Sequence, residues 1–262
     1  MGRLKLTLEY AGTRYSGWQK QKNARTVQGD IERAIAEVTG QRRFEFQGSG
    51  RTDAGVHALQ QVAHLDIQTN LPPEPLRWRL NDELPPDINI LAVDKTHRRF
   101  HARHSAIARS YLYQISRRRT AFAKPFVWWV KEPLDVARIA TAAAAFAGMH
   151  DFRSFSDDDP DEKSTDVLID DVELVEIGDL LLIRVSGSHF LWKMVRRMIG
   201  VLAEVGRGGL DSADLEDFLE KQSGAPAKLT APASGLFLER VFYDGDDRRR
   251  ALVPAVAVPS SR

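Results

Sequence analysis

The chain contains no cysteine, which excludes disulfide bonds, cysteine-ligated zinc or iron–sulfur sites and a thiol nucleophile. It also lacks any run of about 18 uncharged apolar residues, and its N-terminus alternates polar and apolar residues instead of presenting an apolar block. We therefore expect neither a membrane span nor export, and a cytoplasmic location. Aromatic residues are only 8% of the 262, yet 43% are hydrophobic, which excludes a disordered or collagen-like chain.

Charge is nearly balanced overall, because the net charge is +1. The two signs are nevertheless segregated along the chain. Residues 97–119 hold seven arginines, three histidines and no acid, whereas residues 157–176 hold ten acids and one lysine. Such segregation is typical of a protein with one positive face for nucleic acid, although two solvated edges would produce the same pattern.

The first half of the chain predicts the element order βαββαβ. Leu4, Leu6 and Leu8 alternate with polar residues, which indicates a strand with one buried face. Thr26 is a candidate N-cap and Gly40 a candidate stop for the helix between them. The remaining elements are expected as strands at 44–47, 61–67 and 88–94 and as a helix at 75–84.

The second half repeats this order more loosely. The expected elements are a strand at 107–116, a helix at about 135–148, a hairpin of 167–177 and 180–186, helices at 190–205 and 213–221, and a strand at 236–243. We predict an α+β fold of two ferredoxin-like halves with mainly antiparallel sheets and outer helices, meeting at a central basic cleft. The expected domains are 1–104 and 105–245, followed by a flexible tail at 246–262.

The densest chemical segment is residues 48–58, GSGRTDAGVHA. Its three glycines let a substrate approach the backbone closely. Arg51 and Asp53 are two residues apart, so one cleft can hold both, and the guanidinium would keep the carboxylate ionised as a nucleophile or base. A surface turn gives the same pattern. A metal site of Asp53, His57 and His64 is a further alternative, against which His64 is expected on the polar side of a strand.

Residues Gly50–His57 resemble the signature of the bacterial tRNA pseudouridine synthase A family. Other marks of that family follow in order along almost the whole chain. They are residues 17–19 with Gln21, Asn81, 84–88, 100–103, 109–113, 150–155, Phe190, 194–196 and 235–238. Two departures stand out: Ala11 replaces the usual acid of the opening motif, and the acidic stretch Asp157–Asp171 replaces a region where relatives carry a basic residue. A tRNA contact is therefore not expected at that stretch.

The resemblance implies an isomerase that converts uridine to pseudouridine at positions 38, 39 and 40 of the tRNA anticodon stem-loop, with no cofactor and no metal. It implies that Asp53 attacks C6 of the base or C1′ of the ribose, that Tyr111 stacks on the flipped base, and that Arg196 pairs with the aspartate. Arg51 is expected to hold phosphate or a neighbouring flipped base. From pattern alone, Tyr111 is a strand residue typical of a core, and Arg196 belongs to an amphipathic helix.

Extruding a stacked uridine costs a few kcal/mol, which stacking and phosphate contacts offset. The candidate phosphate contacts are Arg14, Lys20, Lys22, Arg25, Arg98, Arg99, Arg103, Lys193 and Arg197. The resemblance also implies tRNA as the partner and a homodimeric enzyme. The apolar residues between Phe122 and Trp129 are either a subunit interface or part of the second domain's core.

Overall fold

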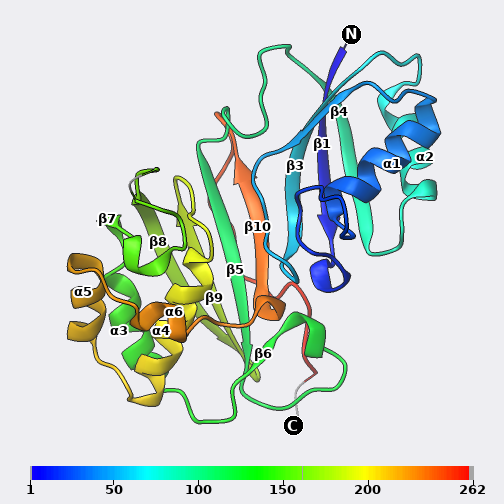
Figure 1. Cartoon of the computed structure of the whole chain (residues 1–262). Helices are drawn as coiled ribbons and strands as arrows, with labels where there is room; N and C mark the ends of the chain where they lie inside the picture. The colour runs from blue at the N-terminus through cyan, green and yellow to red at the C-terminus, as the bar shows by residue number, and fades with distance from the viewer. Residues whose placement is uncertain (1, 161, 260–262) are drawn as a thin grey trace. The chain divides into compact units, whose positions relative to one another are not determined.

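The computed structural model describes residues 2–160 and 162–259 (Figure 1). Its contacts divide the chain into two compact units: unit 1 is Met1–Ile107 with Phe237–Arg248, and unit 2 is Ala108–Leu236 with Arg249–Arg262. This grouping differs from the sequence-based boundaries at 104 and 245. The reason is that β10 (Leu236–Phe242) pairs in parallel with β3, through Phe237 opposite His57 and Leu238 opposite Ala58.

Unit 1 has the predicted βαββαβ order. Strand β1 is antiparallel to both β3 and β4, and β2 is antiparallel to β3. The elements are β1 (Gly2–Tyr10), α1 (Val27–Thr39), β2 (Glu45–Gly48), β3 (His57–Ile67), α2 (Pro73–Glu83) and β4 (Ile88–Thr96), with a 3₁₀ turn η1 (Gly12–Arg14) after β1.

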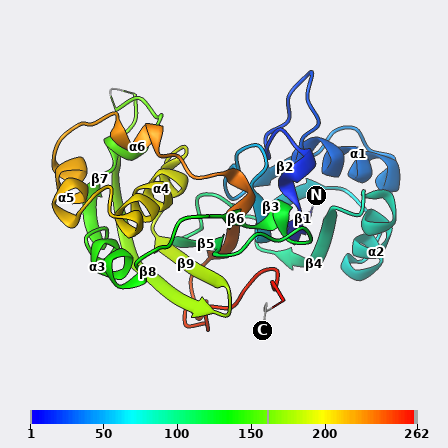
Figure 2. The ribbon, with the colours of Figure 1, turned by 90° about the horizontal axis from the view of Figure 1, so that it is seen from below.

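The local signals read from the sequence account for these elements. Leu4, Leu6 and Leu8 are buried, and α1 and α2 lie together along one face of the unit 1 strands (Figure 2). The Thr26 hydroxyl accepts a hydrogen bond from the Gly29 N–H at 3.3 Å, so it caps α1 as predicted. Gly40 ends the helix at φ +68°, a left-handed conformation that favours glycine.

Unit 2 has its main strands in the order β5-β9-β8-β7, all antiparallel, with β6 parallel to β5. The hairpin predicted at 167–186 is β8 and β9. The helix predicted to extend to about 148 ends at Ala144, and the residues that follow form β7, a strand that the sequence did not predict. The elements are β5 (Ala108–Ser116), β6 (Trp128–Trp129), α3 (Val136–Ala144), β7 (Gly148–Asp151), β8 (Asp166–Ile177), β9 (Leu180–Gly187), α4 (Met194–Arg207), α5 (Ser212–Glu220) and α6 (Ala225–Lys228), with 3₁₀ turns η2 (Lys124–Phe126), η3 (Arg153–Phe155) and η4 (Ala233–Gly235). Both units mix helices with mainly antiparallel strands, which confirms the α+β class.

Part of the segment expected to be a flexible tail makes specific contacts within unit 2. The buried Arg184 guanidinium donates to the carbonyl oxygens of Arg250 and Ala251 at 3.0 and 3.1 Å. The buried Gln114 side chain accepts a hydrogen bond from the Ala255 N–H at 2.7 Å. This segment thus supplies part of the hydrogen bonding of two buried polar side chains of the β5–β9 pair, which also donate to Glu173 and to the Phe126 carbonyl.

The apolar residues 122–129 divide by exposure. Val127 is only 4% exposed, whereas Phe122 is 92% exposed and Trp129 41% exposed. The segment therefore contributes both to the unit 2 core and to its surface. Across the described residues, no helix combines the length and the apolar character needed to cross a membrane.

Candidate active site

Asp53 lies in the loop that joins β2 to β3 in unit 1. The turn closes directly on it, because the Val56 N–H donates to the Asp53 carbonyl oxygen at 3.1 Å. Gly55 takes φ +80°, so a residue without a β-carbon is needed at this position of the turn. The Asp53 side chain is half-buried, while its neighbour Thr52 is buried. The turn thus presents one carboxylate from a backbone of defined shape.

The turn is held by the end of β1 and by the segment that follows it. The Tyr10 and Thr52 hydroxyls form a buried hydrogen bond of 2.8 Å, and the Trp18 N–H donates to the Thr52 carbonyl at 3.0 Å. On the other side of Asp53, the Gly55 N–H donates to the Tyr15 carbonyl at 3.3 Å. Both flanks of the aspartate are therefore fixed, which is how a rigid scaffold orients a reactive side chain.

Gln61 supports the same loop from β3. Its buried side chain accepts a hydrogen bond from the Ser49 hydroxyl at 2.6 Å and donates to the Gly50 carbonyl at 3.2 Å. Tyr10 and Gln61 are not among the residues predicted for the site. In the sequence, Tyr10 follows the alternating residues of the first strand and Gln61 begins another predicted strand, so neither carries a local signal of a role in the site.

Arg51, in the same loop as Asp53, is exposed. Its Nε donates to the Gln19 side-chain oxygen at 3.1 Å, and the Gln19 amide nitrogen donates to Gln28 at 2.9 Å. Gln28 is buried on α1, so a chain of two amides ties the arginine to the helix. Arg51 and Asp53 therefore share the loop, and the Arg51 side chain is oriented by Gln19 and, through it, by Gln28.

The basic residues before α1 divide into two kinds. Arg14 and Lys22 are exposed, whereas Lys20 pairs with Glu32 at 2.6 Å and Arg25 pairs with Asp30 at 3.0 Å. Arg25 also donates to the Tyr15 hydroxyl at 3.0 Å. An ion pair already made must be given up or shared before its cation can neutralise a phosphate. Arg14 and Lys22 are thus the better placed of the predicted contacts here.

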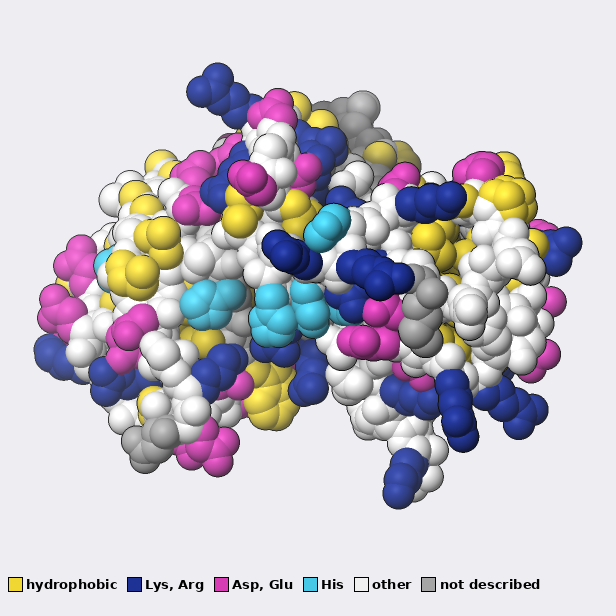
Figure 3. Space-filling view, turned by 90° about the horizontal axis from the view of Figure 1, so that it is seen from above, with side chains coloured by type: hydrophobic (Ala, Val, Ile, Leu, Met, Phe, Trp, Pro, Cys, Tyr) yellow, Lys and Arg dark blue, Asp and Glu magenta, His cyan; other side chains and the backbone are white. Residues whose placement is uncertain are grey.

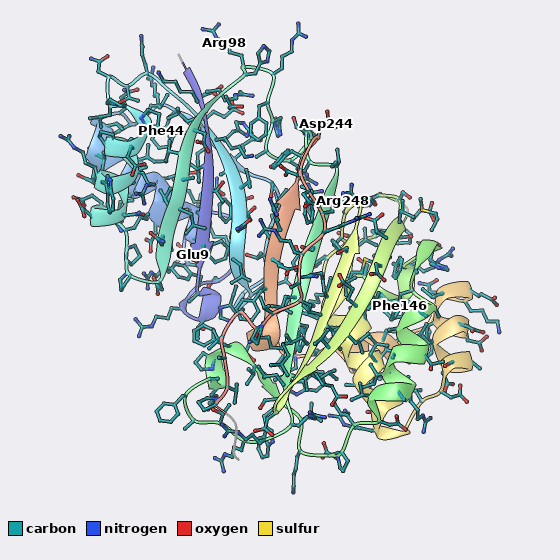
Figure 4. All side chains as sticks on the ribbon, turned by 180° about the vertical axis from the view of Figure 1, so that it is seen from behind. Glu9, Phe44, Arg98, Phe146, Asp244 and Arg248 are labelled. Carbon is teal, nitrogen blue, oxygen red and sulfur yellow. The ribbon has the colours of Figure 1, made fainter. Side chains whose placement is uncertain are left out.

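The connection after β4, residues 97–107, carries Arg98, Arg99 and Arg103 as exposed side chains. The backbone of this basic loop is held by three residues: Arg3 of β1, His64 of β3 and Tyr243 in the turn after β10. Arg3 donates to the Phe100 carbonyl at 2.6 Å, and Tyr243 donates to the Ala102 carbonyl at 2.7 Å. The Ala102 N–H donates to Nδ1 of His64 at 3.2 Å. Figure 4 shows Arg98 beyond the ends of the strands, so this basic loop presents its charge outward from a fixed base.

Two histidines of the basic loop, His101 and His104, cluster with His64 of β3. The His101 ring lies 4.6 Å from that of His64 and 4.3 Å from that of His104, centroid to centroid. Figure 3 shows histidine side chains beside lysine and arginine side chains on the face that it presents. Burial and the nearby Arg3 guanidinium lower the pKa of His64, and burial and the neighbouring histidines lower the pKa of His101.

The structure does not bring Asp53, His57 and His64 together as a metal site. Nδ1 of His57 accepts a hydrogen bond from the Gly12 N–H at 3.0 Å, and its ring stacks on Phe237. Nδ1 of His64 is engaged by the basic loop instead. Within residues 2–160 and 162–259, no group of three or more His, Cys, Asp or Glu side chains has a metal-binding arrangement. The expectation that His64 lies on the polar side of β3 holds, but the side chain is fully buried.

Acidification is expected to destabilise unit 1 through His64. Its pKa is lowered in the folded state, so below about pH 6.5 the unfolded chain binds more protons, and stability is lost as the pH falls. In His64→Asn the amide oxygen still accepts the Ala102 N–H but does not titrate. Urea-unfolding midpoints at about pH 7.5 and about pH 5.5 should therefore differ less in this variant than in the wild type. Equal differences would show that His64 does not carry the pH dependence.

In unit 2, Tyr111 stands on β5 opposite Val185 of β9. Its ring is half-buried and meets the Phe190 ring edge-on at 5.0 Å. Tyr113, two residues along the strand, is 1% exposed and donates its hydroxyl to the Pro232 carbonyl at 2.8 Å. Tyr113 is therefore a core residue, while Tyr111 keeps part of its ring accessible.

Arg196 lies in the first turn of α4. Its Nε donates to the Ala231 carbonyl at 2.8 Å, and its own carbonyl accepts from the Ala231 N–H at 3.0 Å. Of the neighbouring cations, Lys193 pairs with Asp157 at 2.6 Å, and Arg197 pairs with the same carboxylate while being only 5% exposed. Arg197 thus offers a phosphate little surface. The three predicted catalytic residues divide between the units, with Asp53 in unit 1 and Tyr111 and Arg196 in unit 2.

Comparison with known proteins covers nearly the whole chain. The family model described as tRNA pseudouridine synthase matches residues 7–105 and 142–244. The chain is 40% identical over 246 residues to "tRNA pseudouridine synthase A 2" of Bacillus cereus, covering 93% of this chain and 100% of that protein. It is 41% identical to "tRNA pseudouridine synthase A" of Rhodopseudomonas palustris over 247 residues and of Nitrobacter hamburgensis over 246 residues, again covering 93% of this chain and 100% of each relative. These matches show that the chain belongs to the tRNA pseudouridine synthase family, whose members are isomerases.

Proposed function

We propose that this enzyme isomerises uridines at positions 38, 39 and 40 of the tRNA anticodon stem-loop, with Asp53 as the nucleophile. The observation that carries the proposal is the turn around Asp53. It fixes both flanks of one half-buried carboxylate by hydrogen bonds to Tyr10, Tyr15 and Trp18, as a nucleophile that must meet a single carbon atom requires. Family membership shows the reaction class, and the fixed turn supports Asp53 as the nucleophile.

The reaction rearranges bonds within one nucleotide. Asp53 attacks C6 of the base or C1′ of the ribose, the N1–C1′ bond breaks, and the uracil turns so that C5 bonds to C1′. C5 then loses its hydrogen as a proton, N1 holds a proton in the product, and the carboxylate is released. No oxidant, reductant or second substrate enters this balance. Tyr111, with its ring half-exposed beside Phe190, is proposed to stack on the extruded base and to assist proton removal at C5.

Arg196 is proposed to pair with Asp53 during the reaction. The Nε of Arg196 donates to the Ala231 carbonyl, and a guanidinium carries further N–H donors, so an anchored Arg196 can still pair with a carboxylate. Exposed arginines of the basic loop and Arg14 and Lys22 are proposed to contact phosphates. The homodimeric state and the cytoplasmic location stay predictions.

The proposal is tested with tRNA transcripts that carry tritium at C5 of uridine. Release of tritium is expected from a transcript with uridines at positions 38, 39 and 40, because C5 must lose its hydrogen. A transcript with cytidine at those three positions is the matched control and should release none. Equal release from both would place the target elsewhere in the tRNA, and release from neither would reject the proposed function.

A further inference from the structure

Lys193 stands in an unusual backbone conformation just before α4. With φ +64° and ψ 0°, it is the one non-glycine residue with a positive φ in the described part of the chain. Left-handed backbone at a residue with a β-carbon is strained, and it persists only where neighbouring contacts impose it. Such residues concentrate at functional sites.

The contacts that hold Lys193 in this conformation come from the start of the acidic stretch, at Asp157 and Asp158. The Asp157 carboxylate accepts from Lys193 Nζ at 2.6 Å and from the Arg197 guanidinium, and the Asp157 N–H donates to the Trp192 carbonyl at 3.3 Å. The neighbouring Asp158 carboxylate accepts the Trp192 N–H at 3.0 Å. The hydrogen bond from Lys193 lowers the pKa of Asp157, with Arg197 acting in the same direction, so the carboxylate stays charged at neutral pH.

Without this carboxylate, the start of α4 would be electrostatically unfavourable. Lys193, Arg196 and Arg197 place three cations within one turn, at the positive end of the helix dipole. Arg197 is also 5% exposed, so removing its partner leaves a buried charge unpaired. Asp157 offsets both effects from one side of the helix, because Lys193 and Arg197 are four residues apart and share a face.

Arg196 is anchored differently, at the segment before η4. The Arg196 backbone and side chain exchange two hydrogen bonds with Ala231. Helix α4 approaches that segment closely, since a β-carbon on Gly200 would lie 1.7 Å from the Leu229 carbonyl oxygen. The direction of the Arg196 guanidinium is therefore set by how the first turn of α4 meets this segment. Asp157 fixes that turn.

We propose that Asp157 is a positioning residue for pseudouridine formation, acting through Lys193 and Arg197 to hold the first turn of α4 and thereby Arg196. The inference rests on the proposed function, in which Arg196 pairs with the nucleophile. It gives the acidic stretch a role other than contact with tRNA. One of its carboxylates serves as the counter-ion of two cations at the start of α4, Lys193 and the buried Arg197.

The test compares Asp157→Asn with Asp171→Asn. Asp171 is an exposed acid of the same stretch, and no ion pair to it occurs among the described residues, so the control removes equal charge without touching α4. We expect Asp157→Asn to lower the single-turnover rate on saturating tRNA by on the order of 10–100-fold, with little change in the dissociation constant for tRNA. Asp171→Asn should leave the rate unchanged. If both variants instead bind tRNA more tightly at unchanged rate, Asp157 acts only as surface charge and the proposal is wrong.

Folding is monitored in the same preparations, because an unpaired Arg197 lowers stability. The rate of Asp157→Asn is referred to the folded fraction from thermal melting, and Asp157→Glu restores the charge on a longer side chain. Partial recovery of the rate in Asp157→Glu supports positioning, whereas a normal rate per folded molecule of Asp157→Asn rejects it. Wild-type protein that forms no pseudouridine would reject the proposed function itself, and this inference with it.

Discussion

Asp53→Asn is expected to abolish pseudouridine formation while leaving the protein folded. The amide has nearly the shape of the carboxylate but does not attack carbon, and loss of a nucleophile lowers turnover by on the order of 10⁴–10⁶-fold. The fold should survive because the turn is held through the backbone of Thr52, Gly55 and Val56 and through the Thr52 hydroxyl. Tritium release and pseudouridine mapping measure the activity, and thermal melting measures the fold.

The matched control for this variant is Asp82→Asn. Asp82 is an exposed acid on α2 of the same unit, so the charge change is the same but the turn is untouched. We expect the control to keep full activity and the Asp53 variant to bind tRNA with nearly wild-type affinity. Turnover near the wild-type level in Asp53→Asn would remove the aspartate from the chemistry, whatever the control shows.

Elements governed by short-range signals were predictable from the sequence. The alternation of Leu4, Leu6 and Leu8 defined β1, and the Thr26 cap and Gly40 stop defined α1 to within a residue. The hairpin predicted from strands at 167–177 and 180–186 matches β8 and β9 for the same reason. In each case the residues that decide the structure are neighbours along the chain, so that pattern alone carries the information.

The supports of the site were not predictable, because they join residues far apart in sequence. The Tyr10–Thr52 hydrogen bond spans 42 residues, and the Arg197–Asp157 pair spans 40. Lys193 and Arg197 looked like phosphate contacts because nothing near them in sequence reveals the carboxylate that holds them. His64 likewise looked like a polar strand residue, whereas the basic loop that buries it arrives 38 residues later. Long-range partners decide which of several identical cations remain available to a ligand.

Gly12→Ala is expected to displace the Asp53 turn without changing its chemistry. A β-carbon at Gly12 would lie 1.9 Å from the Val56 carbonyl oxygen and 2.6 Å from its carbonyl carbon, so backbone must move. Overpacking of this kind costs about 1–3 kcal/mol of stability. Val56 closes the turn on Asp53, and a shift of about 1 Å at a reacting group lowers turnover by on the order of 100-fold. Thermal melting and single-turnover kinetics on saturating tRNA measure the two effects.

Gly2→Ala is the control for this variant, since nothing lies within 4 Å of a β-carbon at Gly2 and the substitution should change neither stability nor rate. A Gly12→Ala enzyme that is destabilised but turns over normally per folded molecule would show that the turn tolerates displacement. The comparison with Asp53→Asn then separates two contributions to the rate. Asp53→Asn removes the nucleophile from an intact turn, whereas Gly12→Ala keeps the carboxylate and moves it. The residual rate of Gly12→Ala above that of Asp53→Asn therefore measures how much of the catalysis survives when the carboxylate is present but misplaced.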